Sequence, residues 1–422
     1  MTPGLFLYRG LTAAAAPFAA LALAHRARRG KEPTDLQHHR FARDLPTRPT
    51  GQLVWCHGAS IGEIRMLAGL IGERDRTYSI IYTVQTHSAY RVLTPELSDK
   101  DQVFLAPLDL PRIAKRFLDH WRPDLAVFAE SEIWPNLLLG CDTRNIPRIL
   151  LNARLSPKSN SGWQKWPRTA LQLISGFRFV TASAPDQRAG LEALGAHIER
   201  AASNLKIPVA LQHAPEPSRN DHAISSWKAD RKLLLGASTH ESEELMLARA
   251  MKHLDPTKYC LILAPRHPDR AAHIRQSLEE MGSLVAQRSR AEFPSPSDIY
   301  IADTVGEMDL WYELADRVFL GGSHDARLGG HSPLEPAVWG KHVLMGPEMQ
   351  NYREISNRLQ AEGFASEVSS PEDIAKVTAK PRPNPTFDEL RMCFSKELEA
   401  HTHILQSIDS MLEPPLSERS CK

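Results

Sequence analysis

The sequence predicts an α/β protein of the GT-B type, with two Rossmann-like domains facing an interdomain cleft and an N-terminal membrane-anchor helix. Three observations lead to this prediction. The 422 residues exceed one ordinary hydrophobic core. Apolar runs alternate with helix-length segments, as in a parallel sheet with crossover helices. One long apolar segment opens the chain.

The N-terminal segment is apolar from Gly4 to Ala24 and is interrupted by Arg9 and Pro17. A basic cluster comes directly after it, formed by Arg26, Arg28, Arg29 and Lys31. A spanning helix needs about 20 mainly apolar residues, so the segment is marginal as a span and adequate as an interfacial anchor. A cleaved secretory signal is the competing interpretation, but the basic cluster opposes export and keeps the rest of the chain in the cytoplasm. We therefore expect residues 1–30 to anchor the protein to membrane lipids.

Two sets of strand-like runs come after the anchor. The first set predicts strands at 52–58, 79–86, 124–131, 148–154 and 177–183, and the second at 232–238, 258–267, 298–303, 316–322 and 342–346. The segment between them is polar and contains prolines, which is typical of a linker. We therefore expect an N-terminal Rossmann-like domain at 31–210, a linker at 211–226 and a C-terminal Rossmann-like domain at 227–422. Such domains bind ligands at the carboxyl ends of their strands.

Composition excludes several classes of function. A formal net charge of +1 argues against a dedicated nucleic-acid binder. The five cysteines are far apart and form no C-x-x-C, so neither a zinc site nor a disulfide framework is indicated. The D-x-D at Asp99–Asp101 precedes a strand in a polar loop, and we interpret it as solvated. The sequence therefore predicts no metal site and no cofactor.

Polar clusters lie at the ends of the predicted strands. The first strand leads into His57, Ser60 and Glu63, the third into Glu130 and Glu132, and Lys206 ends the first half. In the second half, the polar segments are 236–244, 264–270, 303–308 and 321–336.

The segment "GGHSPLEP" at 329–336 predicts a helix start. Ser332 is a good N-cap, Pro333 suits the first helical position, and Glu335 completes a capping box. This interpretation leaves Gly329 and Gly330 unexplained. Glycines let backbone approach a ligand closely, and a helix N-terminus attracts an anion.

The polar clusters together resemble one known family. In chain order the motifs are "GASIGE", "ESEIWPN", "NARLS", "NLK", "STHESEE", "LILAPRHP", "DTVGEM", "FLGGS", "GGHSPLEP" and "LMGP". In this order they resemble the 3-deoxy-D-manno-octulosonic acid (Kdo) transferases of lipopolysaccharide biosynthesis. The resemblance implies an inverting glycosyltransferase on the cytoplasmic side of the inner membrane. Its donor would be CMP-Kdo, and its acceptor a lipid A precursor.

The resemblance also implies roles for individual residues. Glu63 corresponds to the base that activates the acceptor hydroxyl, and Glu130 and Lys206 to the acid and lysine that stabilise the transition state. The CMP contacts correspond to Arg266, His267, Gly306, Glu307, Met308, Ser332, Pro333, Leu334 and Glu335. Because CMP carries one phosphate, a divalent ion is less needed, and Arg266, Lys206 and a helix N-terminus could serve instead.

Structural interpretations of the same residues remain open. Spacing alone makes Glu63 part of a capping box with Ser60. Glu130 and Glu132 could form a turn with one acid solvated and the other pairing an arginine, and His57 could be a satisfied loop histidine. Two other functions also remain: another GT-B nucleotide-sugar enzyme, such as an epimerase, and a non-catalytic membrane-tethered paralogue.

Overall fold

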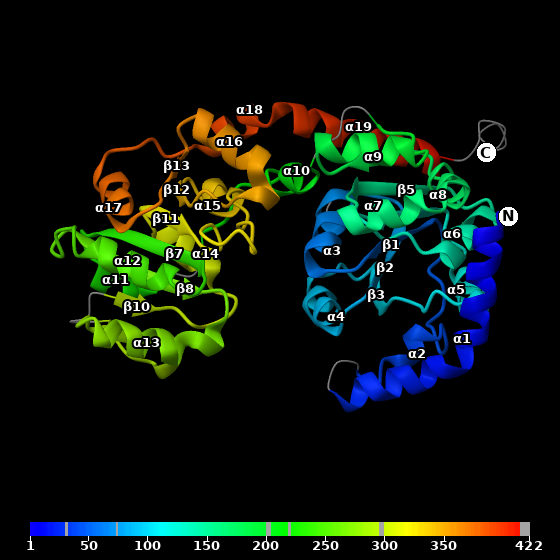
Figure 1. The fold of residues 1–422 in the computed structure, drawn as a ribbon, viewed down its shortest axis with the longest axis horizontal. Helices are drawn as coiled ribbons and strands as arrows, with labels where there is room; N and C mark the ends of the chain where they lie inside the picture. The colour runs from blue at the N-terminus through cyan, green and yellow to red at the C-terminus, as the bar shows by residue number, and fades with distance from the viewer. Residues whose placement is uncertain (30–32, 73–74, 200–203, 218–220, 295–298, 414–422) are drawn as a thin grey trace. The chain divides into compact units, whose positions relative to one another are not determined.

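The structure is a computed structural model that describes residues 1–29, 33–72, 75–199, 204–217, 221–294 and 299–413. The chain forms two compact units (Figure 1). The first unit contains residues 1–209 and those from 396 on, and the second contains residues 210–395. Lys31 of the basic cluster, residues 218–220 of the expected linker and Cys421 lie outside the described residues. The predicted α/β class with two parallel sheets is confirmed.

The first unit is built on a six-stranded sheet of order β3-β2-β1-β4-β5-β6. Neighbouring strands pair in parallel throughout. This is the strand order of the Rossmann fold. Its strands are β1 (Leu53–Gly58), β2 (Ser79–Val84), β3 (Gln102–Leu105), β4 (Leu125–Ala129), β5 (Arg148–Ala153) and β6 (Val180–Ala182).

Helices cover both faces of this sheet, so β1 is buried along its whole length. Residues Leu53 and Trp55 of β1 belong to one core cluster, and Val54 and Cys56 belong to the other. Proline occupies the first turn of α5 to α9, where its missing N–H costs nothing. The helices between the strands are α3 (Ile61–Leu67), α4 (His87–Leu93), α5 (Pro111–Trp121), α6 (Pro135–Asp142), α7 (Pro157–Gln164), α8 (Pro167–Ile174) and α9 (Pro185–Ala193). The short helices are α2 (Gln37–Arg40) and α10 (Lys206–Ala210).

The second unit contains a seven-stranded parallel sheet of order β13-β12-β11-β7-β8-β10-β9. Its strands are β7 (Lys232–Thr239), β8 (Tyr259–Pro265), β9 (Val285–Gln287), β10 (Ile299–Ile301), β11 (Arg317–Leu320), β12 (His342–Met345) and β13 (Ala365–Glu367). Its helices are α11 (His222–Lys228), α12 (Glu243–Met251), α13 (Ala271–Glu280), α14 (Met308–Leu314), α15 (Leu334–Val338), α16 (Arg353–Ala361), α17 (Pro371–Ala379) and α18 (Phe387–Cys393).

The last described helix, α19 (Ser395–Leu412), belongs to the first unit. Its buried residues join the core cluster of β1 and α3, namely Ala400, Ile404, Ile408 and Leu412. The compact units therefore differ at the C-terminal end from the expected domain at 227–422. The chain returns to the first unit because the apolar face of α19 is buried there.

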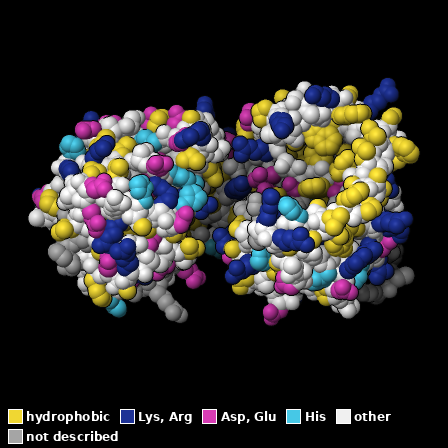
Figure 2. Space-filling model, turned by 60° about the horizontal axis from the view of Figure 1, so that its bottom comes forward, with side chains coloured by type: hydrophobic (Ala, Val, Ile, Leu, Met, Phe, Trp, Pro, Cys, Tyr) yellow, Lys and Arg dark blue, Asp and Glu magenta, His cyan; other side chains and the backbone are white. Residues whose placement is uncertain are grey.

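The N-terminal helix α1 (Pro3–Arg28) is long and apolar enough to cross a membrane, by length and composition. It exposes large apolar side chains at Phe6, Leu7, Leu11, Phe18 and Leu21. Hydrophobic side chains form a band on the surface of the first unit (Figure 2).

The interpretation of the D-x-D as solvated is wrong for Asp101. Its carboxylate is buried against the guanidinium of Arg76 and accepts the N–H of Ile80 at 2.9 Å. Asp101 is therefore a structural acid beside β2.

Candidate active site

The first candidate site lies at the topological switch point of the first sheet, between β1 and β4. Strands β2 and β3 lie on one side of β1, and β4, β5 and β6 lie on the other. Open α/β sheets bind ligands at this position, beyond the carboxyl ends of the two central strands. The loop after β1 leads to Glu63, and the loop after β4 carries Glu130 and Glu132.

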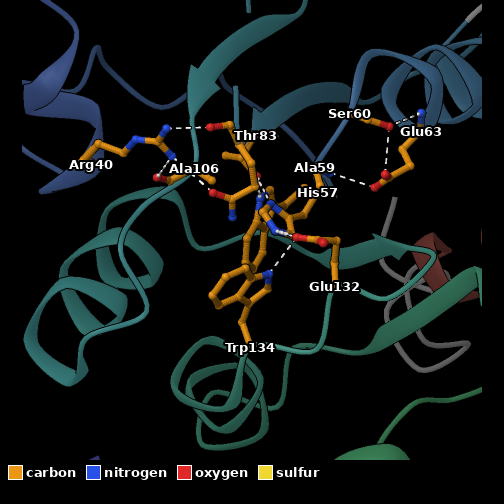
Figure 3. A network of polar contacts seen from close by, with 11 residues as sticks. Arg40, His57, Ala59, Ser60, Glu63, Thr83, Ala106, Glu132 and Trp134 are labelled. Atoms are coloured by element: carbon orange, nitrogen blue, oxygen red, sulfur yellow. Dashed lines mark hydrogen bonds and ion pairs between the residues drawn. The ribbon is translucent and has the colours of Figure 1, made fainter. Parts of the chain in front are cut away.

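Glu63 is buried in the first turn of α3. Its Oε2 accepts the N–H of Ala59 at 2.7 Å, and its Oε1 accepts the hydroxyl of Ser60 at 2.8 Å (Figure 3). Burial raises the pKa of the Glu63 carboxyl, these hydrogen bonds lower it, and the charges of Glu130 and Glu132 raise it further; the net shift is upward. Ser60 is the N-cap, as predicted, but the carboxylate binds the N–H of Ala59 rather than that of the N-cap itself.

Glu130 and Lys206 come together although they are far apart in the sequence. The Nζ of Lys206 lies 2.8 Å from Oε1 of Glu130, and both side chains are partly exposed. Asn152 at the end of β5 joins them: its Nδ2 donates to Glu130 at 3.4 Å, and its Oδ1 accepts the N–H of Leu205 at 3.0 Å. Glu130 and Asn152 both have positive φ, 50° and 56°. Such backbone outliers concentrate at functional sites.

Glu132 has a different partner from the arginine that we considered. His57 is fully buried in β1, where its Nε2 contacts Glu132 Oε2 at 3.0 Å and its Nδ1 contacts Thr83 Oγ1 at 2.8 Å (Figure 3). Trp134 donates its indole N–H to the same carboxylate oxygen at 2.7 Å. Burial opposes ionisation of Glu132, but the hydrogen bonds from His57, Trp134 and Gln85 lower its pKa overall. The lowered pKa favours the ionised form of Glu132, and its contacts with His57 and Trp134 order the loop after β4.

The second unit has an equivalent position between β7 and β11. Glu243 is buried there at the start of α12. It accepts the N–H groups of His240, Gly322 and Ser323 at 2.8, 2.9 and 3.2 Å. This carboxylate fixes the glycine loop after β11 to the loop after β7. The sequence placed Glu243 in a polar cluster but gave no sign of this role.

Histidines gather beside this loop. The Nε2 atoms of His240 and His331 lie 2.9 Å apart, and the ring of His267 meets that of His240 edge-on at 5.7 Å. Burial lowers the pKa of His331 to about 4, and the positive charges of His240 and Arg266 contribute. Arg266 is exposed, and its guanidinium has no recorded hydrogen bond or ion pair within the described part of the chain. Arg266, His267 and His331 therefore lie close together beside the glycine loop after β11.

The segment 306–308 lies after β10 and opens α14. Gly306 is exposed with a φ of 89°, and Met308 is the first residue of the helix. Glu307 forms an ion pair with Arg288 at 2.6 Å, and Arg288 also pairs with Asp221 at 2.6 Å. The hydrogen bond from Arg288 lowers the pKa of Glu307. The sequence contained no signal for this positioning arginine.

The predicted capping box at Ser332 and Glu335 is wrong. Helix α15 begins at Leu334, its N-cap is Pro333, and no side chain caps it. Glu335 is exposed and accepts the hydroxyl of Tyr312 at 3.4 Å, whereas Pro333 and Leu334 are buried. The helix therefore starts one residue later than predicted, and Pro333 lies at the N-cap position instead of the first helical position.

Gly329 and Gly330 approach the chain's own residues. Both have positive φ. A Cβ added at Gly329 would lie 2.7 Å from the side-chain amide of Asn351. A Cβ added at Gly330 would collide with the sulfur of Met349. These glycines therefore allow residues 329 and 330 to pack against residues 349–351.

The described residues contain no group of three or more His, Cys, Asp or Glu side chains placed to hold a metal ion. The first unit presents a buried acid of raised pKa beside an acid–lysine pair. The second presents the exposed Arg266, histidines and a glycine loop, which suit an anionic ligand.

Comparisons with known proteins concern first the fold and then the sequence family. The fold is similar to that of UDP-GlcNAc 2-epimerase from Neisseria meningitidis bound to UDP-GlcNAc, with a TM-score of 0.53 and 12% identity over 85% of this chain and all of that one. The two parallel sheets and this likeness together define the GT-B fold.

The family is shown by the sequence relatives. The family described as "3-Deoxy-D-manno-octulosonic-acid transferase (kdotransferase)" matches residues 34–209. A probable mitochondrial 3-deoxy-D-manno-octulosonic acid transferase of Arabidopsis thaliana is 30% identical over 409 residues, covering 93% of this chain and 91% of the relative. The Haemophilus influenzae transferase is 30% identical over 345 residues, covering 77% and 78%. The chain belongs to the Kdo transferase family, and it is a glycosyltransferase.

Proposed function

We propose that the protein transfers Kdo from CMP-Kdo to a lipid A precursor during lipopolysaccharide biosynthesis. Membership of the Kdo transferase family supports the reaction. The observation that carries the mechanism is the grouping of Glu63 with the Glu130–Lys206 pair at the central strands of the first sheet. That grouping gives the first unit both a base and a positive charge.

Glu63 acts as the general base in this proposal. A base works best when its pKa lies near the working pH, and burial moves the pKa of Glu63 upward from that of an ordinary glutamate. The hydrogen bonds from Ala59 and Ser60 hold the carboxylate in one orientation. The acceptor hydroxyl would lose its proton to Glu63 as its oxygen attacks the anomeric carbon of Kdo, and the bond from that carbon to the CMP phosphate oxygen would break and release CMP.

The Glu130–Lys206 pair stabilises the charge that develops in the transition state. The ammonium group of Lys206 stays partly exposed and is directed by Glu130 and Asn152. A charge fixed before the reaction needs no reorganisation when the phosphate leaves.

The second unit binds the CMP part of the donor in this proposal. Arg266 and His267 would contact the phosphate, and Gly306, Glu307, Met308 and the segment Ser332–Glu335 would surround the nucleoside. Support comes from the exposed guanidinium of Arg266, which has no partner among the described residues, and from the loop that Glu243 orders. We assign the acceptor to the domain at 31–210 and the donor to the domain that begins at 227.

The membrane is the proposed location, with the enzyme on the cytoplasmic side of the inner membrane. Support comes from the apolar composition of α1 and from the arginines at its C-terminal end.

An acceptor-dependence assay tests the function. Purified protein is incubated with CMP-Kdo, with and without the tetraacylated lipid A precursor, and CMP release is measured. We expect release to depend on the acceptor. Release at the same rate without acceptor would contradict transfer, and epimerisation of a UDP-sugar would support the epimerase alternative.

A further inference from the structure

The less exposed residues of helix α1 form one continuous face. From Leu5 onward, every buried or half-buried residue of α1 except Arg9 belongs to one series with spacings of three and four. The series is Leu5, Tyr8, Thr12, Ala16, Ala19, Leu23 and Ala27. Such spacing marks one side of a helix. The series reaches from the first turn of α1 to its last.

Specific contacts fix the first half of α1. Leu5 is fully buried in a core cluster of the first unit. The hydroxyl of Tyr8 donates to Oδ2 of the buried Asp109 at 2.9 Å, and Nδ2 of Asn136 donates to Thr12 at 3.2 Å. Asp109 also accepts the N–H groups of Asn136 and Leu137 in the first turn of α6. Helix α1 is thus built into the unit by polar and apolar contacts together.

The opposite face of α1 is apolar and exposed. It carries Phe6, Leu7, Leu11, Phe18 and Leu21, which are between 51% and 71% exposed. Trp166 extends this face, because a Cβ on Gly4 would lie 3.1 Å from its ring. Trp166 and Leu171 are both 52% exposed. Figure 2 shows hydrophobic side chains in a band on this unit, with Lys and Arg side chains beside it.

Basic residues flank the apolar face at both ends. Lys165 and Arg168 are exposed on either side of Trp166, and Arg28 and Arg29 are exposed at the end of α1. Tryptophan and basic side chains are enriched at the level of lipid headgroups. The distribution of charge and apolar surface therefore fits one leaflet of an anionic bilayer.

A transmembrane arrangement conflicts with these contacts. Crossing the hydrocarbon core takes about 20 residues. The contact series leaves no such stretch free, because Leu5 near one end and Leu23 near the other are both buried. Crossing would also remove the Tyr8 hydroxyl from Asp109.

We infer that α1 lies in the plane of the membrane as part of the first unit and inserts its outer face into one leaflet. This inference rests on the proposed membrane location and goes beyond it, since it assigns both ends of α1 to the same side of the bilayer.

Two experiments on the full-length chain test this arrangement. In the first, Leu11→Glu/Phe18→Glu should weaken binding to phosphatidylcholine–phosphatidylglycerol vesicles at least about 10-fold, because an interfacial helix binds through its buried apolar area. Phe293→Glu/Met392→Glu is the matched control, since these side chains are 73% and 76% exposed in the second unit. We expect the control to bind normally and both variants to melt like the parent. Unchanged vesicle binding by Leu11→Glu/Phe18→Glu would contradict the inference.

The second experiment locates the ends of α1. Pro3→Cys and Arg28→Cys are labelled separately with a membrane-impermeant maleimide, and the labelled peptides are identified by mass spectrometry. We expect both positions to react in inside-out inner-membrane vesicles and neither to react in intact spheroplasts. Labelling of Pro3→Cys in spheroplasts, or its protection in inside-out vesicles, would overturn the in-plane arrangement. Kdo transfer in detergent is measured in parallel, so a failure of the proposed function is seen separately from a failure of membrane docking.

Discussion

Glu63→Gln separates the proposed catalytic role of Glu63 from its structural role. The substitution removes the basic carboxylate but keeps the shape of the side chain. Its amide oxygen can accept the N–H of Ala59, and its amide nitrogen can donate to the hydroxyl oxygen of Ser60, so both partners of the carboxylate keep a hydrogen bond. A hydrogen bond to a charged group contributes about 1.5–3 kcal/mol and a neutral one about 0.5–1.5 kcal/mol, so the exchange costs about 1 kcal/mol per bond. The neutral amide offsets part of this cost, because burial disfavours the charged carboxylate. We therefore expect a folded variant that melts close to the parent.

The effect on catalysis should be much larger. Loss of a general base typically lowers the rate by about 10²–10⁴-fold. We expect Glu63→Gln to bind CMP normally and to transfer Kdo at least ~10²-fold more slowly in an initial-rate assay. The parent should also lose activity as the pH falls through the raised pKa of Glu63, so the acid limb of its pH–rate profile should lie above the ordinary glutamate value of 4.5.

Glu389→Gln provides a matched control. Glu389 also occupies the third position of a helix, where it completes a capping box with Thr386 at the start of α18. We expect this variant to retain the parental transfer rate. Full activity of Glu63→Gln would refute the assignment, and the base would then have to be sought at Glu130 or Glu132.

Three further predictions concern Asn152, the effect of chelation, and three histidines of lowered pKa. Asn152→Ala leaves the N–H of Leu205 without its acceptor and frees Glu130, so we expect a loss of about 1–3 kcal/mol in urea unfolding and slower transfer; an unchanged rate would argue against a positioning role. Chelation with EDTA should leave the transfer rate nearly unchanged, and a large loss restored by magnesium would contradict this. Burial lowers the pKa values of His39, His331 and His342 to about 4, so the unfolded state binds more protons below pH 6.5. Stability should therefore fall as the pH drops from 6.5 towards 4, and a flat profile of melting temperature in that window would disprove it.

The central strands could be predicted from the sequence because each is a continuous apolar run buried on both faces. The strands that the sequence did not reveal are β3, β9 and β13, and all three lie at the edges of their sheets. Edge strands are short and pack against fewer neighbours, so they leave a weak apolar pattern. The return of α19 to the first unit is a long-range contact, which the pattern of a helix cannot specify.

In the candidate site too, local patterns could be predicted from the sequence and long-range contacts could not. The motifs placed Glu63 and Glu130 at strand ends and Lys206 at the end of the first half of the chain, and the structure brings Glu130 and Lys206 into contact. The residues that orient them were not predictable, because Asn152 acts on partners 22 and 53 positions away. The capping box at Ser332 failed for a local reason, since the helix starts after Pro333.

Mass spectrometry of the lipid product tests the central claim most directly. The full-length protein is incubated with CMP-Kdo and the tetraacylated lipid A precursor, and the extracted lipid is analysed with Glu389→Gln and Glu63→Gln run in parallel. We predict that the parent and Glu389→Gln add one or more Kdo residues to the lipid and that Glu63→Gln adds almost none. An acceptor of unchanged mass after incubation with parental protein that binds CMP would contradict the account and would support a non-catalytic paralogue.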